Sequence, residues 1–175
     1  LSMGFFSKSE LKKKYEVGKD VLGTGNFAEV RKCTPKESAG AKVEYAVKII
    51  DKSKVEDMGD IEREVAIMET IDHPNCIKLI EIFDEPKKMN LILELVTGGE
   101  LFDAIVNKGS FTEKDAATVM HSLCNCLAYL HEQNIVHRDL KPENILMKDV
   151  KHNCSEIKVA DFGLARMISA KDMMK

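Results

Sequence analysis

The spacing of apolar residues changes once along this 175-residue chain, from a strand-like pattern to a helical one. In the first part, apolar residues alternate with polar ones or form short runs, as expected for strands. These strand-like runs occupy residues 15–17, 28–30, 43–50 and 91–95. One helix interrupts them, beginning near Gly59, because Ile61, Val65, Met68 and Ile71 recur at helical spacing. The first part is therefore predicted to be β-rich with one main helix.

After Thr97-Gly98-Gly99 the pattern becomes helical. It predicts a short helix over residues 100–107 and a long one over residues 112–131. Thr112 followed by Asp115 resembles a capping box in which Asp replaces Glu. The chain is therefore predicted to be α+β, with two lobes that join at residues 96–99, and clefts between such lobes commonly bind ligands. The predicted parts are a tail over residues 1–14, partly vector-derived, a β-rich lobe over residues 15–96 and a helical lobe over residues 97–175.

Composition argues against several classes of protein. The formal net charge is −3 and no basic block is present, so neither nucleic acid nor a membrane is expected as the main partner. Five cysteines without a C-x-x-C pair argue against a disulfide framework and favour a reducing, cytoplasmic location. His73 has no second candidate ligand nearby in the sequence, so a structural turn is favoured over a metal site there.

A glycine-rich stretch, residues 23–30, lies between two strand-like runs. Glycine lets the backbone turn tightly and direct its N–H groups toward an anion, so this stretch is suited to phosphate. A dinucleotide-binding fingerprint is the alternative, because Glu44 lies at about the distance that this fingerprint requires. That fingerprint also needs a helix directly after the glycines, but Pro35 and Gly40 follow instead. The context therefore argues against the alternative.

Two charged residues lie at positions where apolar residues are expected. In residues 43–50, strand alternation places Lys48 on the same face as Ala46. This lysine is either an edge residue whose ammonium reaches water or a buried cation that faces phosphate. Glu64 lies on the apolar stripe of the predicted helix, where it is either solvated at the helix edge or paired with a cation. Lys48 is the obvious candidate for that cation.

A highly charged loop lies between two short apolar runs in residues 135–147. It places the carboxylate of Asp139 beside the cation of Lys141, with the carboxamide of Asn144 shortly after them. Asp161 follows another apolar run and supplies a second carboxylate at a strand end. These are hard oxygen ligands of the kind that magnesium uses together with phosphate and water. With the glycine turn and Lys48, the loop indicates a phosphoryl-transfer site rather than random surface charge.

This ordered set of motifs resembles the protein kinases. The resemblance covers residues 15–175 and implies a bilobal protein-kinase-like fold with a β-rich N-lobe and a mainly helical C-lobe. It also implies ATP and Mg²⁺ as cofactors. The matching positions are residues 23–30 for the glycine loop, Lys48 for the strand lysine, Glu64 for the helix glutamate, residues 137–144 for the catalytic loop and residues 161–163 for the metal-binding triplet.

The resemblance implies a role for each matching residue of the predicted C-lobe. Asp139 would orient the substrate hydroxyl and accept its proton, and Lys141 would neutralise charge on the transferred group. Asn144 and Asp161 would hold magnesium on the nucleotide phosphates.

The same resemblance implies how the nucleotide is bound. Lys48, fixed by Glu64, would bind the α- and β-phosphates. The glycine-loop residues would be Gly23, Thr24, Gly25, Asn26, Phe27 and Ala28. The residues implied for the adenine pocket are Val30, Ala46, Leu93, Glu94, Val96 and Leu146.

Other residues resemble one class of kinases in particular. Lys141 and Asn144 fit the serine/threonine class, and residues 95–103 and 129–134 are most similar to the calcium/calmodulin-dependent group. Glu100 and Glu143 match positions where related kinases receive an arginine of the substrate. The resemblance therefore implies protein substrates with Ser or Thr acceptors and a preference for basic sequences. Calmodulin or calcium-linked regulation would lie outside this segment, because no D-x-[DN]-x-[DN]-G loop is present.

Two features depart from the family pattern. Ala28 replaces the third glycine of the loop, which would stiffen it. After Gly163 only residues 164–175 follow, whereas the family's chain continues, so truncation within the activation segment and an incomplete C-lobe are predicted. The absent helices would leave the apolar stripe of the 112–131 helix exposed and prone to self-association.

Two rival functions follow. One is a nucleotide-binding but catalytically impaired kinase fragment or interaction module. A pseudokinase-like module of this kind usually lacks the lysine, the base or the metal-binding aspartate. The other rival is a calcium-sensor protein, which would need the D-x-[DN]-x-[DN]-G loop that is not found. Because Lys48, Asp139 and Asp161 are all present, the sequence favours an active serine/threonine kinase as the parent enzyme.

Overall fold

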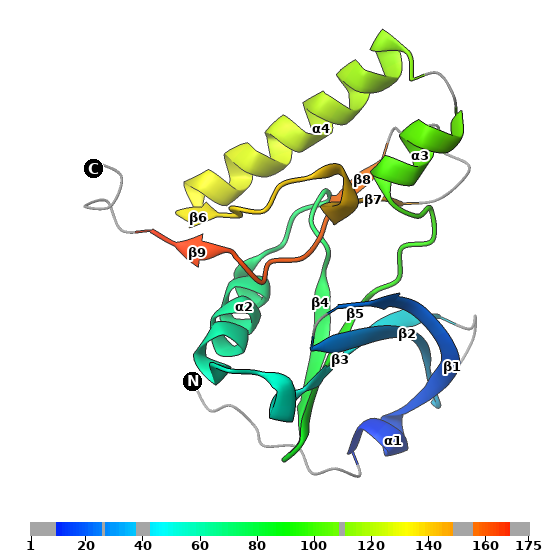
Figure 1. Cartoon of the computed structure of the whole chain (residues 1–175), viewed down its shortest axis with the longest axis vertical. Helices are drawn as coiled ribbons and strands as arrows, with labels where there is room; N and C mark the ends of the chain where they lie inside the picture. Colours follow the sequence, from blue (N-terminus) through cyan, green and yellow to red (C-terminus); the bar gives the residue numbers. More distant parts are fainter. Residues whose placement is uncertain (1–9, 26, 38–42, 109–110, 149–155, 169–175) are drawn as a thin grey trace. The chain divides into compact units, whose positions relative to one another are not determined.

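A computed structural model describes residues 10–25, 27–37, 43–108, 111–148 and 156–168 (Figure 1). The chain forms two compact units. The first unit contains the described residues up to Met58 together with Leu79–Leu95, and the second contains Gly59–Lys78 together with the described residues from Val96 onward. Within the described residues, no helix is both long enough and apolar enough to cross a bilayer.

The first unit is built on one five-stranded antiparallel sheet (Figure 1). Its strands follow the order β1-β2-β3-β5-β4. The strands are β1 (Tyr15–Thr24), β2 (Ala28–Pro35), β3 (Tyr45–Asp51), β4 (Leu79–Asp84) and β5 (Lys88–Glu94). The β-rich part predicted from the sequence is therefore confirmed, although β4 was not among the predicted strands. A single 3-10 turn, η1 (Lys52–Lys54), follows β3.

The core of this unit lies on one face of the sheet. Val47 and Ile92, which are opposite each other on β3 and β5, are both completely buried in it. Leu11 from the short helix α1 (Glu10–Lys14) also joins this core, so packed structure begins before Tyr15. Tyr15 itself packs edge-on against Phe83, with ring centroids 5.9 Å apart.

The second unit contains three helices and two pairs of short strands within its described residues. The helices are α2 (Met58–Thr70, the unit taking it from Gly59), α3 (Leu101–Lys108) and α4 (Glu113–Glu132). The strands are β6 (Ile135–Val136), β7 (Ile145–Met147), β8 (Ile157–Val159) and β9 (Arg166–Met167), with the 3-10 turn η2 (Pro142–Asn144) before β7. Strands β6 and β9 pair antiparallel, as do β7 and β8.

Local signals place the long helix α4 where the sequence predicts it. The Thr112 hydroxyl accepts a hydrogen bond from the Asp115 backbone N–H, and the Asp115 carboxylate accepts one from the Thr112 N–H. This reciprocal capping box satisfies two N–H groups at the helix start. Val119 and Leu130 are buried on the apolar stripe, whereas Met120 is 54% exposed.

A glycine allows the segment after the first unit to approach β7 closely. Gly98 donates its N–H to the Met147 carbonyl at 3.0 Å, and Gly99 accepts from the Met147 N–H at 2.8 Å. A Cβ at Gly98 would fall on the backbone of Met147. Backbone cannot move aside as a flexible side chain can, so only glycine fits at this position.

We therefore expect the Gly98→Ala variant to lose roughly 1–3 kcal/mol of unfolding free energy, the typical cost of overpacking. Chemical denaturation of the purified chain measures this loss. Gly23→Ala is the matched control, because a Cβ at Gly23 would meet nothing within 4 Å. Equal stability of the two variants would contradict the close approach seen at Gly98.

Candidate active site

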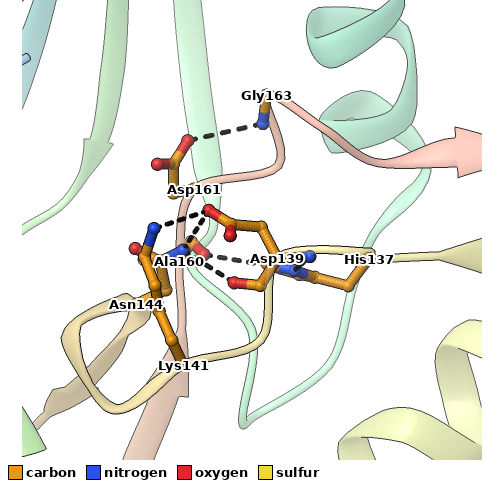
Figure 2. Close-up of polar contacts among 7 residues, drawn as sticks. All are labelled: His137, Asp139, Lys141, Asn144, Ala160, Asp161 and Gly163. Carbon is orange, nitrogen blue, oxygen red and sulfur yellow. Dashed lines mark hydrogen bonds and ion pairs between the residues drawn. The ribbon is translucent and has the colours of Figure 1, made fainter.

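The loop between β6 and β7 brings together the polar residues that the sequence singles out (Figure 2). Pro142 starts the 3-10 turn η2, which folds the chain back so that Asn144 faces Asp139. Asn144 is 8% exposed, and its Nδ2 donates to the Asp139 backbone carbonyl at 2.8 Å and to Oδ2 of the Asp139 carboxylate at 2.9 Å. These bonds fix the position of the Asp139 carboxylate.

The same two hydrogen bonds settle the orientation of the Asn144 carboxamide. Both acceptors belong to Asp139 and neither can donate, so the NH₂ group of Asn144 faces them. The carbonyl oxygen Oδ1 then points away from Asp139. It is the atom of Asn144 that a hard cation would use.

Lys141 lies beside Asp139 and forms an ion pair with it. Its Nζ donates to Oδ2 at 2.9 Å, on side chains that are 47% exposed for Lys141 and 27% exposed for Asp139. The Lys141 hydrogen bond lowers the pKa of Asp139, and the Asn144 hydrogen bond acts in the same direction. Since both contacts involve Oδ2, the other oxygen of Asp139, Oδ1, remains for a substrate group. Asp139 is thus held as an ionised carboxylate.

Asp161 follows β8 and lies in the same part of the second unit. In the view of Figure 2, the Asp161 side chain lies above the side chains of Asn144 and Asp139. Its negative charge contributes to the raised pKa of Lys141, after the Asp139 hydrogen bond, so the two groups lie close enough to interact. Asp161 has a φ of 60°, a left-handed conformation that Asp tolerates better than most residues.

The turn after Asp161 approaches helix α2. The Gly163 N–H donates to Asp161 Oδ1 at 3.4 Å. A Cβ on Gly163 would lie 3.6 Å from Glu64 Oε2, so the buried Glu64 carboxylate of α2 reaches this turn. Arg166 of β9 also donates to Asp60 near the start of α2 at 3.0 Å. Helix α2 and the Asp161 segment are thereby held together within the second unit.

His137 lies within the predicted catalytic loop, but the sequence alone does not indicate a role for it. It is 1% exposed and connects the catalytic loop to the end of β8. Its Nδ1 accepts from the Asp139 N–H at 3.3 Å, so the proton resides on Nε2, which donates to the Ala160 carbonyl at 3.0 Å. Its ring also packs against Phe162, with centroids 5.0 Å apart. The apolar run before His137 was the only local signal of its burial.

The neutral state of His137 predicts a pH dependence of stability. Burial lowers the pKa of His137 below its usual value. As pH falls through the unfolded-state pKa of about 6.5, the unfolded chain therefore binds a proton before the folded chain does, and stability is lost. We expect the melting temperature to fall by a few degrees between about pH 7.5 and pH 5.5. The His137→Gln variant keeps a donor and an acceptor but does not titrate, so its profile should be flatter; an equally steep profile would contradict this assignment.

Four of the predicted nucleotide-binding residues of the first unit share one face of the sheet. Val30 of β2 lies opposite Lys48, and Leu93 of β5 lies opposite Ala46. Directly opposed residues of antiparallel strands have their side chains on the same face, as do residues two apart on one strand. Val30, Ala46, Lys48 and Leu93 therefore form one surface, on the side away from Val47 and the core.

The other predicted residues lie in both units. Gly23 and Thr24 end β1, Ala28 begins β2, and Gly25 donates its N–H to the Ala28 carbonyl at 2.8 Å. Phe27 is exposed, and Asn26 lies outside the described residues. Glu94 ends β5 and lies opposite Tyr45, hence on the other face from Leu93. In the second unit, the backbones of Glu100 and Leu146 form an isolated antiparallel β-bridge. Val96 starts the segment before α3, and Glu143 is exposed on η2.

Comparisons with known proteins identify the family of this chain. Residues 15–175 match the family described as "Protein kinase domain". The chain belongs to the protein kinase family. The kinase fold predicted from the sequence is thereby confirmed, as is the similarity to serine/threonine kinases.

Several curated serine/threonine kinases resemble this kinase chain. Myosin light chain kinase A of Dictyostelium discoideum is 46% identical over 169 residues, covering 95% of this chain and 56% of that protein. Serine/threonine-protein kinase DCLK3 of Homo sapiens is 44% identical over 161 residues, which are 91% of this chain and 24% of that protein. Calcium/calmodulin-dependent protein kinase type 1 of Macrobrachium nipponense is 45% identical over 150 residues, which are 85% and 43%. The kinase chain thus spans between about a quarter and somewhat over half of these relatives.

Proposed function

We propose that this chain transfers the γ-phosphoryl group of ATP to a serine or threonine hydroxyl of a protein. The observation that carries the proposal is the cluster of Asp139, Lys141 and Asn144 with Asp161 beside it, within a protein kinase family chain. Ionised carboxylates, a cation and a carboxamide in this arrangement suit phosphoryl transfer, in which catalysis is mostly positioning and electrostatics.

Asp139 is the proposed catalytic base. Its carboxylate is held by Asn144 and Lys141 through Oδ2, which leaves Oδ1 to orient the substrate hydroxyl and accept its proton. Lys141 would also neutralise charge on the transferred group. His137 is proposed as a positioning residue, because its hydrogen bonds tie the Asp139 backbone to the end of β8.

The residues present fit a magnesium ion. Asn144 presents a carbonyl oxygen and Asp161 a carboxylate, which are the donor types that Mg²⁺ prefers, and both are proposed as its ligands. When bound, magnesium neutralises charge on the phosphate oxygens. The proposed nucleotide contacts are Lys48 with Glu64, the glycine-loop residues Gly23, Thr24, Gly25, Asn26, Phe27 and Ala28, and Val30, Ala46, Leu93, Glu94, Val96 and Leu146.

Thermal melting with and without Mg²⁺ and ATP, run beside a peptide phosphorylation assay on the same sample, tests the proposal. A rise in melting temperature together with phosphate transfer is expected. A rise without transfer would instead favour the alternative, a nucleotide-binding but catalytically impaired interaction module. No rise and no transfer would contradict both.

Substrate choice is a further part of the proposal. Glu100 and Glu143 are exposed carboxylates of the second unit, where α3 packs against η2. A substrate arginine upstream of the acceptor would pair with them, so we expect a preference for basic peptides. We expect Glu143→Gln to lower kcat/KM for an arginine-containing peptide by about 5-fold, with little change for the matched peptide lacking arginine. If the wild type phosphorylates library peptides equally well with and without an upstream arginine, this preference is contradicted.

Two further proposals concern regulation and location. Two of the relatives are named as calcium-dependent and calcium/calmodulin-dependent kinases. We propose that calmodulin or another calcium-linked input regulates this chain, and that this regulation acts outside residues 1–175. A cytoplasmic location is proposed from the cysteine content alone.

A further inference from the structure

Three side chains outside the proposed active site meet in the second unit. They are His73, which follows α2, Cys76 from the same segment, and Cys126 on α4, and their ligand atoms all lie within 4.8 Å of one another. Cys76 Sγ lies 3.2 Å from Cys126 Sγ, and both residues are buried. Local spacing does not predict the contact between Cys76 and Cys126, because these two cysteines are 50 positions apart.

Contacts that do not involve sulfur hold the two cysteines in place. On one side, Asn75 and Ile77 hydrogen-bond to Val159 of β8, at 2.7 and 2.9 Å, and so fix the backbone around Cys76. On the other side, Tyr129 lies one helical turn after Cys126. Its ring stacks on His73 with centroids 4.9 Å apart, and its hydroxyl accepts from the Asp72 N–H at 2.9 Å. The close approach of the two sulfurs is therefore supported on both sides.

A metal ion is not the favoured occupant of this cluster. Two thiolates on a tetrahedral zinc lie about 3.8 Å apart, given Zn–S bonds of about 2.3 Å, and the observed sulfurs are closer than that. His73 Nδ1 already accepts from the Asn75 N–H at 3.1 Å. The buried Lys158 also donates to the Cys76 carbonyl at 3.4 Å, and this nearby cation opposes a divalent ion.

The pair is better suited to redox chemistry. Cys76 and Cys126 are thiols in the structure, hydrogen-bonded to each other. The hydrogen bond from Cys76 lowers the pKa of the Cys126 thiol, although burial acts in the opposite direction. A thiolate is the reactive form in oxidation and exchange, so a shared hydrogen bond favours reaction at Cys126.

We propose that Cys76 and Cys126 form a reversible intrachain disulfide when the chain is exposed to a hydroperoxide. The Cys126 thiolate attacks the O–O bond of hydrogen peroxide, giving a sulfenic acid and, after protonation of the released hydroxide, water. The Cys76 sulfur then attacks the sulfenic sulfur, and the S–S bond forms as the S–O bond breaks. The departing hydroxide takes up the Cys76 thiol proton and leaves as a second water. In total, two thiols are oxidised and one peroxide is reduced to two waters. A dithiol such as dithiothreitol reverses the step by thiol–disulfide exchange.

The bond needs only a small movement and has a definite structural effect. The sulfurs must approach by about 1.2 Å to reach the S–S length of about 2.05 Å. The disulfide would then join the segment between α2 and β4 covalently to α4. Since both sulfurs are buried, a small oxidant such as hydrogen peroxide is required.

Peptide mapping of the purified full chain tests the proposal without nucleotide. The reduced, desalted chain is treated with hydrogen peroxide, remaining thiols are alkylated, and a non-reducing digest is analysed by mass spectrometry. We expect a linked pair of peptides carrying Cys76 and Cys126, about 2 Da lighter than the two free peptides together. We also expect the melting temperature to rise by about 5 °C or more on oxidation and to return after dithiothreitol.

Variants separate this bond from other oxidation products. The matched control is Cys124→Ser, since Cys124 is exposed on the same helix, and this variant should keep the cross-link. Cys76→Ser and Cys126→Ser should each lose it. Separate alkylation of Cys76 and Cys126, or cross-links through Cys124, would overturn the proposal. So would a bound zinc ion that protects both thiols until a chelator removes it. If the serine variants do not fold, the wild-type peptide map alone decides.

Discussion

Replacing Asp139 with Asn is expected to lower kcat for peptide phosphorylation by about 10²- to 10⁴-fold, the range typical of a lost general base. An asparagine keeps one oxygen that can accept from Lys141 and Asn144, the two partners of Asp139 Oδ2. The loop should therefore keep its shape. The group that would face the substrate hydroxyl becomes an amide, which neither carries negative charge nor accepts the proton.

Initial rates of phosphate transfer measure this loss, and melting with Mg²⁺ and ATP shows whether nucleotide binding survives. We expect the ligand-induced shift of the Asp139→Asn variant to match that of the wild type. Asp103→Asn is the control, because Asp103 is an exposed carboxylate on α3 of the same unit. An Asp139→Asn variant with wild-type kcat would remove Asp139 from the proposed mechanism.

Replacing Asp161 with Asn should lower nucleotide binding as well as turnover, whereas Asp139→Asn should lower turnover alone. Asn tolerates the left-handed backbone that Asp161 adopts, with φ of 60°, so the turn should survive. The variant loses the negative charge proposed to hold magnesium. We expect kcat/KM to fall by roughly two to three orders of magnitude, which corresponds to the loss of several kcal/mol of metal-ion stabilisation.

Titration of the melting temperature with Mg²⁺ at fixed ATP distinguishes this outcome. The wild type should show a magnesium-dependent rise, and the Asp161→Asn variant should show little or none. The Asp139→Asn variant is the matched comparison, since it should keep the rise while losing turnover. An undiminished magnesium response in Asp161→Asn would exclude this carboxylate as a ligand.

Strong local patterns explain why much of the fold could be predicted from the sequence. Helix α4 has a capping box and an apolar stripe, and it begins where these signals place it. Strand β3 alternates clearly and was also predicted. Strand β4 was missed, because Ile80 is 40% exposed and a register shift between Leu79 and Glu81 interrupts the two-residue period.

The ends of some elements depend on pairing rather than on local sequence. Strand β2 was predicted over residues 28–30 but continues to Pro35, through the charged residues Arg31 and Lys32. Strand β1 pairs with β2 as far as Pro35 and β3 pairs with it as far as Cys33, and these ladders hold the charged residues in a strand. Such tertiary effects are invisible to a pattern read along one segment.

The candidate site was predicted in part for the same reason. Asp139, Lys141 and Asn144 lie within one short loop, so their proximity follows from the sequence, whereas their roles stay predictions. The position of His137 depends on the distant Ala160, and Cys76 meets Cys126 only through the packing of α4. No spacing rule along the chain connects such residues.

A crystal structure of the chain with Mn²⁺ and a nonhydrolysable ATP analogue tests the central claim most directly. Manganese replaces magnesium on oxygen ligands, and its anomalous scattering locates it without ambiguity. We predict a metal ion bound by Asn144 Oδ1 and the Asp161 carboxylate, with the Asp139 carboxylate nearby but not a ligand. A metal ion and nucleotide bound away from Asn144 and Asp161 would contradict the account.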